Sequence, residues 1–310
     1  MKFPLPLRGI IPPLVTPLLD QDRLDEEGLA RLIEHVLAGG VHGLFVLGTT
    51  GEGPSLSHRL QRELVQRACQ QAAGRAPVLV GITDTAPKES LELAAAAAQA
   101  GADALVLAPP YYFPISQADL IGYVERLAAQ LPLPLFLYNL PSHTKASFEV
   151  ETVQRLIDMP QVIGLKDSSG DLIHFQRVAR LARQRPDFSL LVGPEQLLAA
   201  SVLLGGHGGV PGGANLLPRL FVELYEAATA GDLARVRTLQ DQVMLLDATL
   251  YRVNRSPSAF IQGVKSALSC LGICRDVMAH PCQPFHEEEQ AQVRRHLESL
   301  GIERPVTAAM

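Results

Sequence analysis

The chain has 310 residues, of which 47% are hydrophobic and 19% charged. This composition can bury a sizeable core and excludes the disordered class. The net charge of −5 and the lack of any Lys/Arg run argue against nucleic acid or an anionic membrane as partner. The four cysteines form no CxxC pair, and no stretch reaches the roughly 20 apolar residues that span a bilayer. We therefore expect a cytoplasmic protein.

Short apolar runs alternate with helical patterns along the first 230 residues. Eight runs predict strands, at residues 9–16, 43–47, 78–81, 104–107, 135–138, 162–166, 189–192 and 208–210. The segments between them predict helices, at residues 25–40, 57–74, 87–101, 117–130, 148–159, 171–185 and 195–204. After residue 217 only helical patterns occur, at about 218–230, 232–250, 257–271 and 286–300.

Strands that alternate with helices in this way form a parallel sheet. Eight such units predict an α/β fold, a (β/α)8 TIM barrel at about residues 9–230. A C-terminal helical extension at about 231–302 completes one domain of residues 1–310, because no linker or change of composition divides the chain. A doubly wound sheet would carry a glycine-rich phosphate loop after its first strand, but residues 17–20 (PLLD) contain no glycine.

One lysine, Lys166, ends the apolar run of residues 162–166. The chain has only five lysines against 22 arginines, so a lysine at this position indicates a task that arginine cannot perform. Burial disfavours the ammonium form, and the neutral amine can attack a carbonyl to form an imine. The alternative is a lysine whose charged end simply reaches solvent.

Other polar side chains follow the carboxyl ends of predicted strands, where a barrel has its site. They are Thr49 and Thr50 after the second strand, Tyr112 after the fourth and Tyr138 at the end of the fifth. Each alone could be a helix cap or ordinary packing, but together they predict one pocket. Tyr138 could transfer protons beside Lys166, and the loop through Thr50 and Gly51 could hold a carboxylate. A carboxylate beside a carbonyl is the mark of a 2-keto acid. No His/Cys cluster has metal-ligand spacing, so we expect neither metal nor cofactor.

Four motifs together resemble the dihydrodipicolinate synthase/N-acetylneuraminate lyase family of class I aldolases. They are GTTGE at 48–52, YNLP at 138–141, GLKD at 164–167 and GGV at 208–210, and the likeness extends to PSAFIQGVKSAL at 257–268. The resemblance implies a lyase with Lys166 as the Schiff-base lysine and Tyr138 as the proton relay. It also implies that Thr49 and Tyr112 complete a hydroxyl chain, Tyr112 from a neighbouring subunit of a homotetramer built as a dimer of dimers. Thr50 and the Val210 backbone would seat the pyruvyl group.

Departures from the family pattern bear on the second substrate and on regulation. His143 occupies the position of an arginine that grips a substrate carboxylate in the synthases, and Lys145 replaces a usual glycine. A histidine lacks the two-pronged donor of arginine, so we favour a 2-keto-3-deoxy sugar-acid type aldolase. The alternatives are dihydrodipicolinate synthase, condensing pyruvate with aspartate semialdehyde, and a protein that only binds 2-keto acids.

Three further residue interpretations complete the prediction. His58 and Glu89 match the family's lysine-feedback positions, whereas Gln61 and Thr85 do not, so feedback inhibition by lysine is doubtful. We expect Glu52 to have a structural hydrogen-bonding role and His174 to lie on a helix surface.

Overall fold

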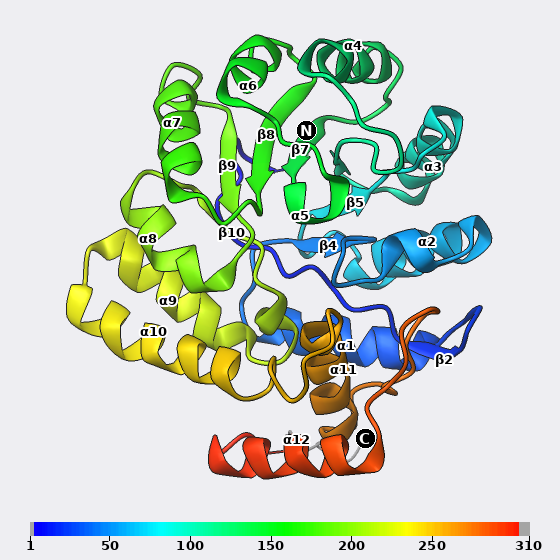
Figure 1. The fold of residues 1–310 in the computed structure, drawn as a ribbon, viewed down its shortest axis with the longest axis vertical. Coiled ribbons are helices and arrows are strands. Elements are labelled where there is room, and N and C mark those ends of the chain that lie inside the picture. The colour runs from blue at the N-terminus through cyan, green and yellow to red at the C-terminus, as the bar shows by residue number, and fades with distance from the viewer. Residues whose placement is uncertain (1–2, 304–310) are drawn as a thin grey trace.

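The computed structural model describes residues 3–303. Eight parallel strands form one sheet in the order β1-β10-β9-β8-β7-β6-β5-β4 (Figure 1). They are β1 Gly9–Ile10, β4 Leu44–Val46, β5 Val78–Gly81, β6 Ala104–Leu107, β7 Leu135–Asn139, β8 Val162–Asp167, β9 Ser189–Val192 and β10 Gly208–Gly209. Extended residues after β1 close the barrel against β4: the Phe45 N–H donates to the Pro12 carbonyl at 3.0 Å, and the Leu14 N–H donates to the Phe45 carbonyl at 2.8 Å. The predicted TIM barrel is confirmed.

Helices follow the strands as the sequence predicts. Those of the barrel are α1 Glu26–Ala38, α2 His58–Ala72, α3 Pro87–Ala100, α4 Gln117–Ala128, α6 Val150–Leu156, α7 Leu172–Ala182, α8 Leu198–Leu203 and α9 Pro218–Ala230. Three more, α10 Leu233–Ala248, α11 Ala259–Cys270 and α12 Glu287–Ser299, form the C-terminal extension, with α12 lying outermost beside α11 (Figure 1). Side chains that accept a backbone N–H of the first turn begin five helices: Asp25, Ser57, Ser116, Asp171 and Asp232.

Several short elements were not predicted. A two-stranded antiparallel hairpin, β2 Leu18–Asp20 and β3 Arg23–Leu24, fills the turn after the first strand. The helix α5 Pro141–Thr144 follows β7, and the 3-10 turns η1 Gly53–Ser55 and η3 Gly212–Asn215 follow β4 and β10. A third 3-10 turn, η2 Glu195–Leu197, is the first turn of the helix predicted at 195–204. The elements α5, η1 and η3 follow strand ends at which candidate site residues lie.

Two layers of buried side chains explain which strand residues reach the site. An inner cluster fills the barrel, and a larger outer cluster lies between strands and helices. Leu137 and Leu165 belong to the outer cluster. Because successive strand residues point to opposite faces, the next residues, Tyr138 and Lys166, point into the mouth of the barrel.

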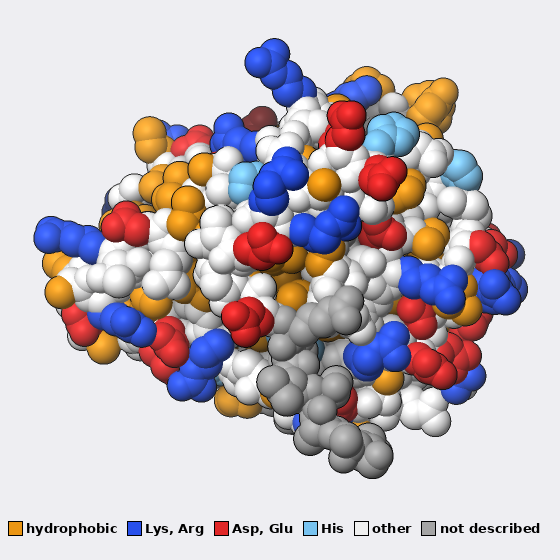
Figure 2. Space-filling view, turned by 90° about the horizontal axis from the view of Figure 1, so that it is seen from below, with side chains coloured by type: hydrophobic (Ala, Val, Ile, Leu, Met, Phe, Trp, Pro, Cys, Tyr) orange, Lys and Arg blue, Asp and Glu red, His pale blue; other side chains and the backbone are white. Residues whose placement is uncertain are grey.

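The outer surface carries charges of both signs. On the face seen in Figure 2, basic and acidic side chains are interspersed among the described residues, and neither sign gathers into one patch. Many of them pair, as Arg75 does with Glu34 and Arg235 with Glu223. Among residues 3–303, no helix is both long and apolar enough to cross a bilayer.

Candidate active site

Lys166 and Tyr138 lie side by side at the carboxyl ends of adjacent strands. They are register partners in the β7–β8 pair. Only 5% of Lys166 and 7% of Tyr138 is exposed. The Lys166 Nζ lies 4.0 Å from the centroid of the Tyr138 ring and 4.8 Å from that of Phe45. Burial lowers the pKa of Lys166, with Tyr138 acting in the opposite direction, so the amine loses its proton more readily than an exposed lysine.

Tyr138 also contacts the loop that follows β4. Its hydroxyl lies 3.3 Å from the Thr49 Oγ1, close enough for a hydrogen bond. Burial alone would raise the pKa of Tyr138. The charge of Lys166 and hydrogen bonds with Thr49, Ser168 and Lys166 outweigh this effect and lower the pKa. The phenol therefore links the lysine to the threonine loop and is placed to move a proton between them.

A cavity of about 200 Å³ opens above Lys166. Polar residues at or after the ends of four strands line it, together with an aromatic ring from α11. The lining includes Tyr138, Lys166, Thr50, Val210, Glu195 and Phe260. The cavity therefore combines a buried amine with a hydroxyl from the threonine loop, as the sequence predicts for a 2-keto acid site.

Two of the expected binding residues, Gly51 and Val210, already use backbone groups in hydrogen bonds within the protein. The Gly51 N–H donates to the Gly48 carbonyl at 3.1 Å, and its carbonyl accepts from the Thr16 Oγ1 at 2.6 Å. Gly51 therefore shapes the turn, and its N–H is not free to bind a carboxylate. The Val210 N–H donates to the Val192 carbonyl at 2.8 Å, so only the carbonyl of Val210 can face a ligand.

A second, larger cavity of about 410 Å³ lies on the other side of Tyr138. Its lining is mostly apolar, with hydroxyls from Thr49, Ser55, Thr83, Tyr111, Thr144 and Ser258. Glu52 is the one carboxylate in this lining, and no lysine or arginine of the described chain belongs to it. His143 lies at the solvent-exposed rim, where partial burial lowers its pKa. The part of the site expected to meet the second substrate therefore offers no fixed positive charge.

Lys145 lies in the loop that carries His143, at a position whose backbone conformation favours glycine. This residue ends α5 with φ of 56°, in the left-handed region where glycine is favoured. The glycine expected at this position by resemblance would adopt that conformation without steric cost. Here the loop keeps it with a lysine.

Tyr112 is not brought to the site of its own chain. The residue is 73% exposed and packs edge-on against Phe113, with ring centroids 4.9 Å apart. Neither ring lines either cavity. An exposed aromatic pair of this kind is suited to a protein–protein contact, and the expected role of Tyr112 in a neighbouring site stays a prediction.

Glu195 is a site residue that sequence reasoning missed. Its Oε1 accepts from the Tyr251 hydroxyl and its Oε2 from the Gly213 N–H, both at 2.7 Å. Burial raises the pKa of Glu195 to about 7, against the opposing effect of these donors. In the sequence, the one feature that could have indicated Glu195 is its position directly after the strand at 189–192. Phe260 also lines the cavity, and its one indication is that it belongs to the 257–268 motif.

His174 was wrongly assigned to the surface. Its side chain is 13% exposed, its Nδ1 lies 2.8 Å from the Asp167 Oδ2, and its Nε2 lies 2.8 Å from the Phe148 carbonyl. Asp167 also accepts from the Asn139 Nδ2 at 3.1 Å. This network lies directly behind Tyr138 and Lys166, since Asn139 and Asp167 are the next residues along the two strands.

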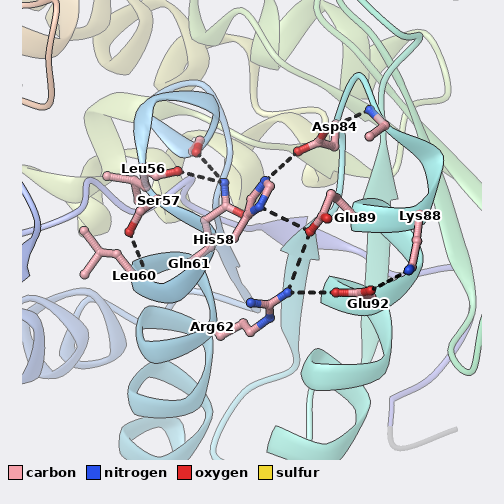
Figure 3. Close-up of polar contacts among 12 residues, drawn as sticks. Leu56, Ser57, His58, Leu60, Gln61, Arg62, Asp84, Lys88, Glu89 and Glu92 are labelled. Atoms are coloured by element: carbon pink, nitrogen blue, oxygen red, sulfur yellow. Dashed lines mark hydrogen bonds and ion pairs between the residues drawn. The ribbon is translucent and has the colours of Figure 1, made fainter.

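Figure 3 shows His58, Gln61 and Glu89, three of the positions that correspond to the family's lysine-feedback site. His58 lies between Asp84 at 2.9 Å and Glu89 at 3.2 Å, and Arg62 pairs with Glu92 at 3.2 Å. Gln61 instead donates to the Gly53 carbonyl at 3.0 Å, beside the threonine loop. The polar side chains at these positions therefore pair with one another or with the backbone. The absence of lysine feedback stays a prediction. Among residues 3–303, no three His, Cys, Asp or Glu side chains are grouped to hold a metal ion.

Comparisons with known proteins agree with this geometry. Residues 6–300 match the model of the Dihydrodipicolinate synthetase family. The chain belongs to this family. A curated relative, the 4-hydroxy-tetrahydrodipicolinate synthase of Methanopyrus kandleri, is 34% identical over 300 residues, covering 96% of this chain and 97% of that protein. The synthase of Azoarcus sp. BH72 is 36% identical, with 96% and 99% covered.

Solved structures of the family are similarly close. The dihydrodipicolinate synthase of Bacteroides thetaiotaomicron is 55% identical with a TM-score of 0.94, covering 96% of this chain and 100% of that chain. A prophage protein of E. coli K12, solved in complex with pyruvate, is 31% identical with a TM-score of 0.90, with 96% and 99% covered. The resemblance drawn from the four motifs is therefore confirmed, and the chain is a lyase of the pyruvate-dependent aldolase and synthase type.

Proposed function

We propose that this family member forms a Schiff base between Lys166 and pyruvate or a longer 2-keto acid, and then makes or cleaves a C–C bond. The observation that carries the proposal is the buried amine of Lys166, 4.0 Å from the Tyr138 ring and with a lowered pKa. The pyruvate held by the E. coli relative supports the same first substrate.

The proposed reaction uses groups already placed in the site. The neutral Lys166 nitrogen adds to the keto carbon, the keto oxygen is protonated and leaves as water, and a protonated imine remains. Tyr138 and Thr49 pass protons to and from the intermediates, and Thr50 binds the carboxylate end. Loss of a proton from the adjacent methyl carbon gives an enamine, whose carbon attacks an aldehyde. Cleavage runs through the same states in reverse.

For the second substrate, the first candidate is aspartate semialdehyde, which makes the chain a 4-hydroxy-tetrahydrodipicolinate synthase. The names of the curated relatives support this candidate over the sugar-acid aldolase favoured by the sequence. We place it first because these relatives align over 95% or more of the chain.

A specific observation favours a second candidate, an aldolase for uncharged polyhydroxy aldehydes. The larger cavity carries hydroxyls but no lysine or arginine in the described chain, and His143 replaces the expected arginine. A substrate carboxylate placed there would lack an ionic partner, which is costly where water is excluded.

One assay separates the candidates. Purified protein is given pyruvate with aspartate semialdehyde, and separately 2-keto-3-deoxy sugar acids, and the product of each is measured. Synthase activity that rises in the variant His143→Arg supports the first candidate. Pyruvate release from the sugar acids, with no synthase product, supports the second. The variant Lys166→Ala should abolish either reaction, and full activity in that variant would contradict the Schiff base itself.

We also propose, from the resemblance and the exposed Tyr112, that the chain acts as a homotetramer built from dimers in the cytoplasm. Small molecules are its proposed partners, with neither nucleic acid nor membrane involved. Residues 1–310 are proposed to fold as one domain.

A further inference from the structure

A buried ion pair joins the C-terminal helix α11 to the loop that carries Thr49 and Thr50. Lys265 of α11 is 0% exposed, and its Nζ donates to the Glu52 Oε1 and, at 2.6 Å, to the Val277 carbonyl. The other Glu52 oxygen accepts from the Ala279 N–H at 2.7 Å. Both carboxylate oxygens are thus engaged. Glu52 has the structural role that the sequence suggested, and its partners lie more than 210 residues away in the chain.

The backbone of Glu52 shows why this contact matters for the site. Its φ is 55°, in the left-handed region that a non-glycine residue rarely occupies. In this conformation the Glu52 N–H donates to the Thr49 carbonyl at 3.0 Å, and the Gly53 N–H donates to the Gly48 carbonyl at 3.2 Å. These two bonds close the turn that presents both threonines. An unfavourable conformation persists only where surrounding contacts fix it.

The ion pair is better suited to fixing this loop than to stabilising the fold. Taking two charges out of water costs roughly what their attraction returns, so an apolar pair of the same size is often no less stable. The Thr49 hydroxyl of the turn contacts Tyr138. The other described side chains that contact the turn, Thr16 and Gln61, reach only backbone carbonyls of Gly51, Gly53 and Leu56. Lys265 is the side chain that holds Glu52 itself.

We propose that Lys265 is a positioning residue: acting through Glu52, it holds the threonine loop so that Thr49 meets Tyr138 and Thr50 faces the Lys166 cavity. The C-terminal extension is therefore part of the catalytic apparatus, although Lys265 touches no substrate. This inference rests on the proposed function for its kinetic consequence, but the position of the loop can be measured without it.

The test compares wild type with Lys265→Met, which approximately keeps the length of the side chain but removes its charge. Borohydride trapping of Lys166 at increasing pyruvate concentration gives the half-saturating concentration without a second substrate. We expect this value to rise roughly 10-fold or more in the variant, because small misplacements of binding groups have effects of this order. The control Asn254→Ala removes a 2.7 Å hydrogen bond from the loop before α11 to Glu289 of α12 and should leave the value unchanged.

A double-mutant cycle distinguishes positioning from general loss of structure. If Lys265 acts through the loop, Lys265→Met should have little further effect in a Thr50→Ala background. Additive effects of the two substitutions would overturn the proposal. If Lys265→Met does not fold, the double variant Lys265→Met with Glu52→Gln replaces it in the test, because it removes both buried charges. We expect that double variant to fold with a raised half-saturating concentration, and a wild-type value would overturn the role of the ion pair.

Hydrogen exchange gives a readout that does not depend on the reaction. Amides of residues 48–53 should exchange faster in Lys265→Met than in wild type or in Asn254→Ala. Unchanged exchange in this segment would contradict the inference even if pyruvate is trapped normally. Absence of trapping in wild type with pyruvate and with longer 2-keto acids, combined with faster exchange in the variant, would instead reject the proposed function and leave the positioning role standing.

Discussion

At the scale of single residues, the chemistry of the site depends on the contact between Lys166 and Tyr138. The variant Tyr138→Phe keeps the aromatic ring over the amine but removes the hydroxyl that lies 3.3 Å from Thr49. We expect kcat to fall by about 100-fold to 10,000-fold, the usual contribution of a proton-transfer group. Tyr225→Phe, outside both cavities, is the matched control. Steady-state kinetics on both variants checks this, and a normal rate in Tyr138→Phe would remove the relay from the mechanism.

The raised pKa of Glu195 predicts how the stability of the protein depends on pH. Its pKa is raised from 4.5 to about 7 in the folded protein, so the folded state binds more protons than the unfolded state between these values. Stability from this group is therefore present at low pH and is lost as pH rises from 4.5 through 7, by on the order of 3 kcal/mol. Urea unfolding at pH 5 and pH 7.5 measures the loss. Glu195→Gln should lose less over the same interval, and an equal loss would be evidence against the shifted pKa.

The sequence identified the residues whose chemistry is unusual for their position. Lys166, Tyr138, Thr49 and Thr50 could be found because a polar side chain directly after a buried strand is conspicuous in a barrel. The roles of Glu195 and His174 could not be read from their positions, because these roles depend on partners, Tyr251 and Asp167, whose proximity only the folded chain creates. Glu52 was assigned its structural role without its partner Lys265, 213 residues away.

At the scale of elements, the eight strands were predictable because parallel strands buried on both faces appear as continuous apolar runs. The hairpin β2–β3 was missed because its strands have three and two residues and resemble an ordinary turn. The helix α5 was missed because four residues are too few to show helical periodicity. Closure of the barrel by residues 12–14 also depends on contacts with Phe45 that no local pattern reveals.

The contact between β8 and α7 yields a second prediction about pH. Both ring nitrogens of His174 face acceptors, the Asp167 carboxylate and the Phe148 carbonyl, so the protonated ring can donate to both at once. Burial alone would lower the pKa of His174, but Asp167 and the Phe148 carbonyl outweigh it and raise the pKa above 6.5. Its stabilisation is present below pH 6.5 and is lost as pH rises through the folded-state value.

The variant His174→Leu tests this assignment. It leaves a buried Asp167 oxygen without its partner, and we expect a loss of about 1–3 kcal/mol at pH 6. The difference from wild type should shrink at higher pH, where the wild-type ring loses its proton. Urea unfolding across this range measures the difference. A difference that stays constant with pH would mean that folding does not raise the pKa of His174.

At the scale of the whole molecule, the exposed Tyr112 allows a test of whether two subunits share each active site. If Tyr112 serves the site of a neighbouring subunit, Lys166→Ala and Tyr112→Ala each inactivate the protein by different routes. Mixed dimers then contain one complete site, with Lys166 from one chain and Tyr112 from the other. Unfolding and refolding an equal mixture should restore about one quarter of wild-type activity, as expected for random pairing in a two-fold dimer. No recovery would place Tyr112 outside the neighbouring site.

The most direct test of the central claim is borohydride trapping with pyruvate, followed by intact mass and peptide mapping. We expect one reduced pyruvyl group per chain, located on the peptide that contains Lys166, and no label in Lys166→Ala. Because Lys166 is the one described lysine that lines either cavity, a label at Lys166 alone would identify the reacting amine. Absence of any label with pyruvate and with longer 2-keto-3-deoxy acids would contradict the Schiff-base mechanism.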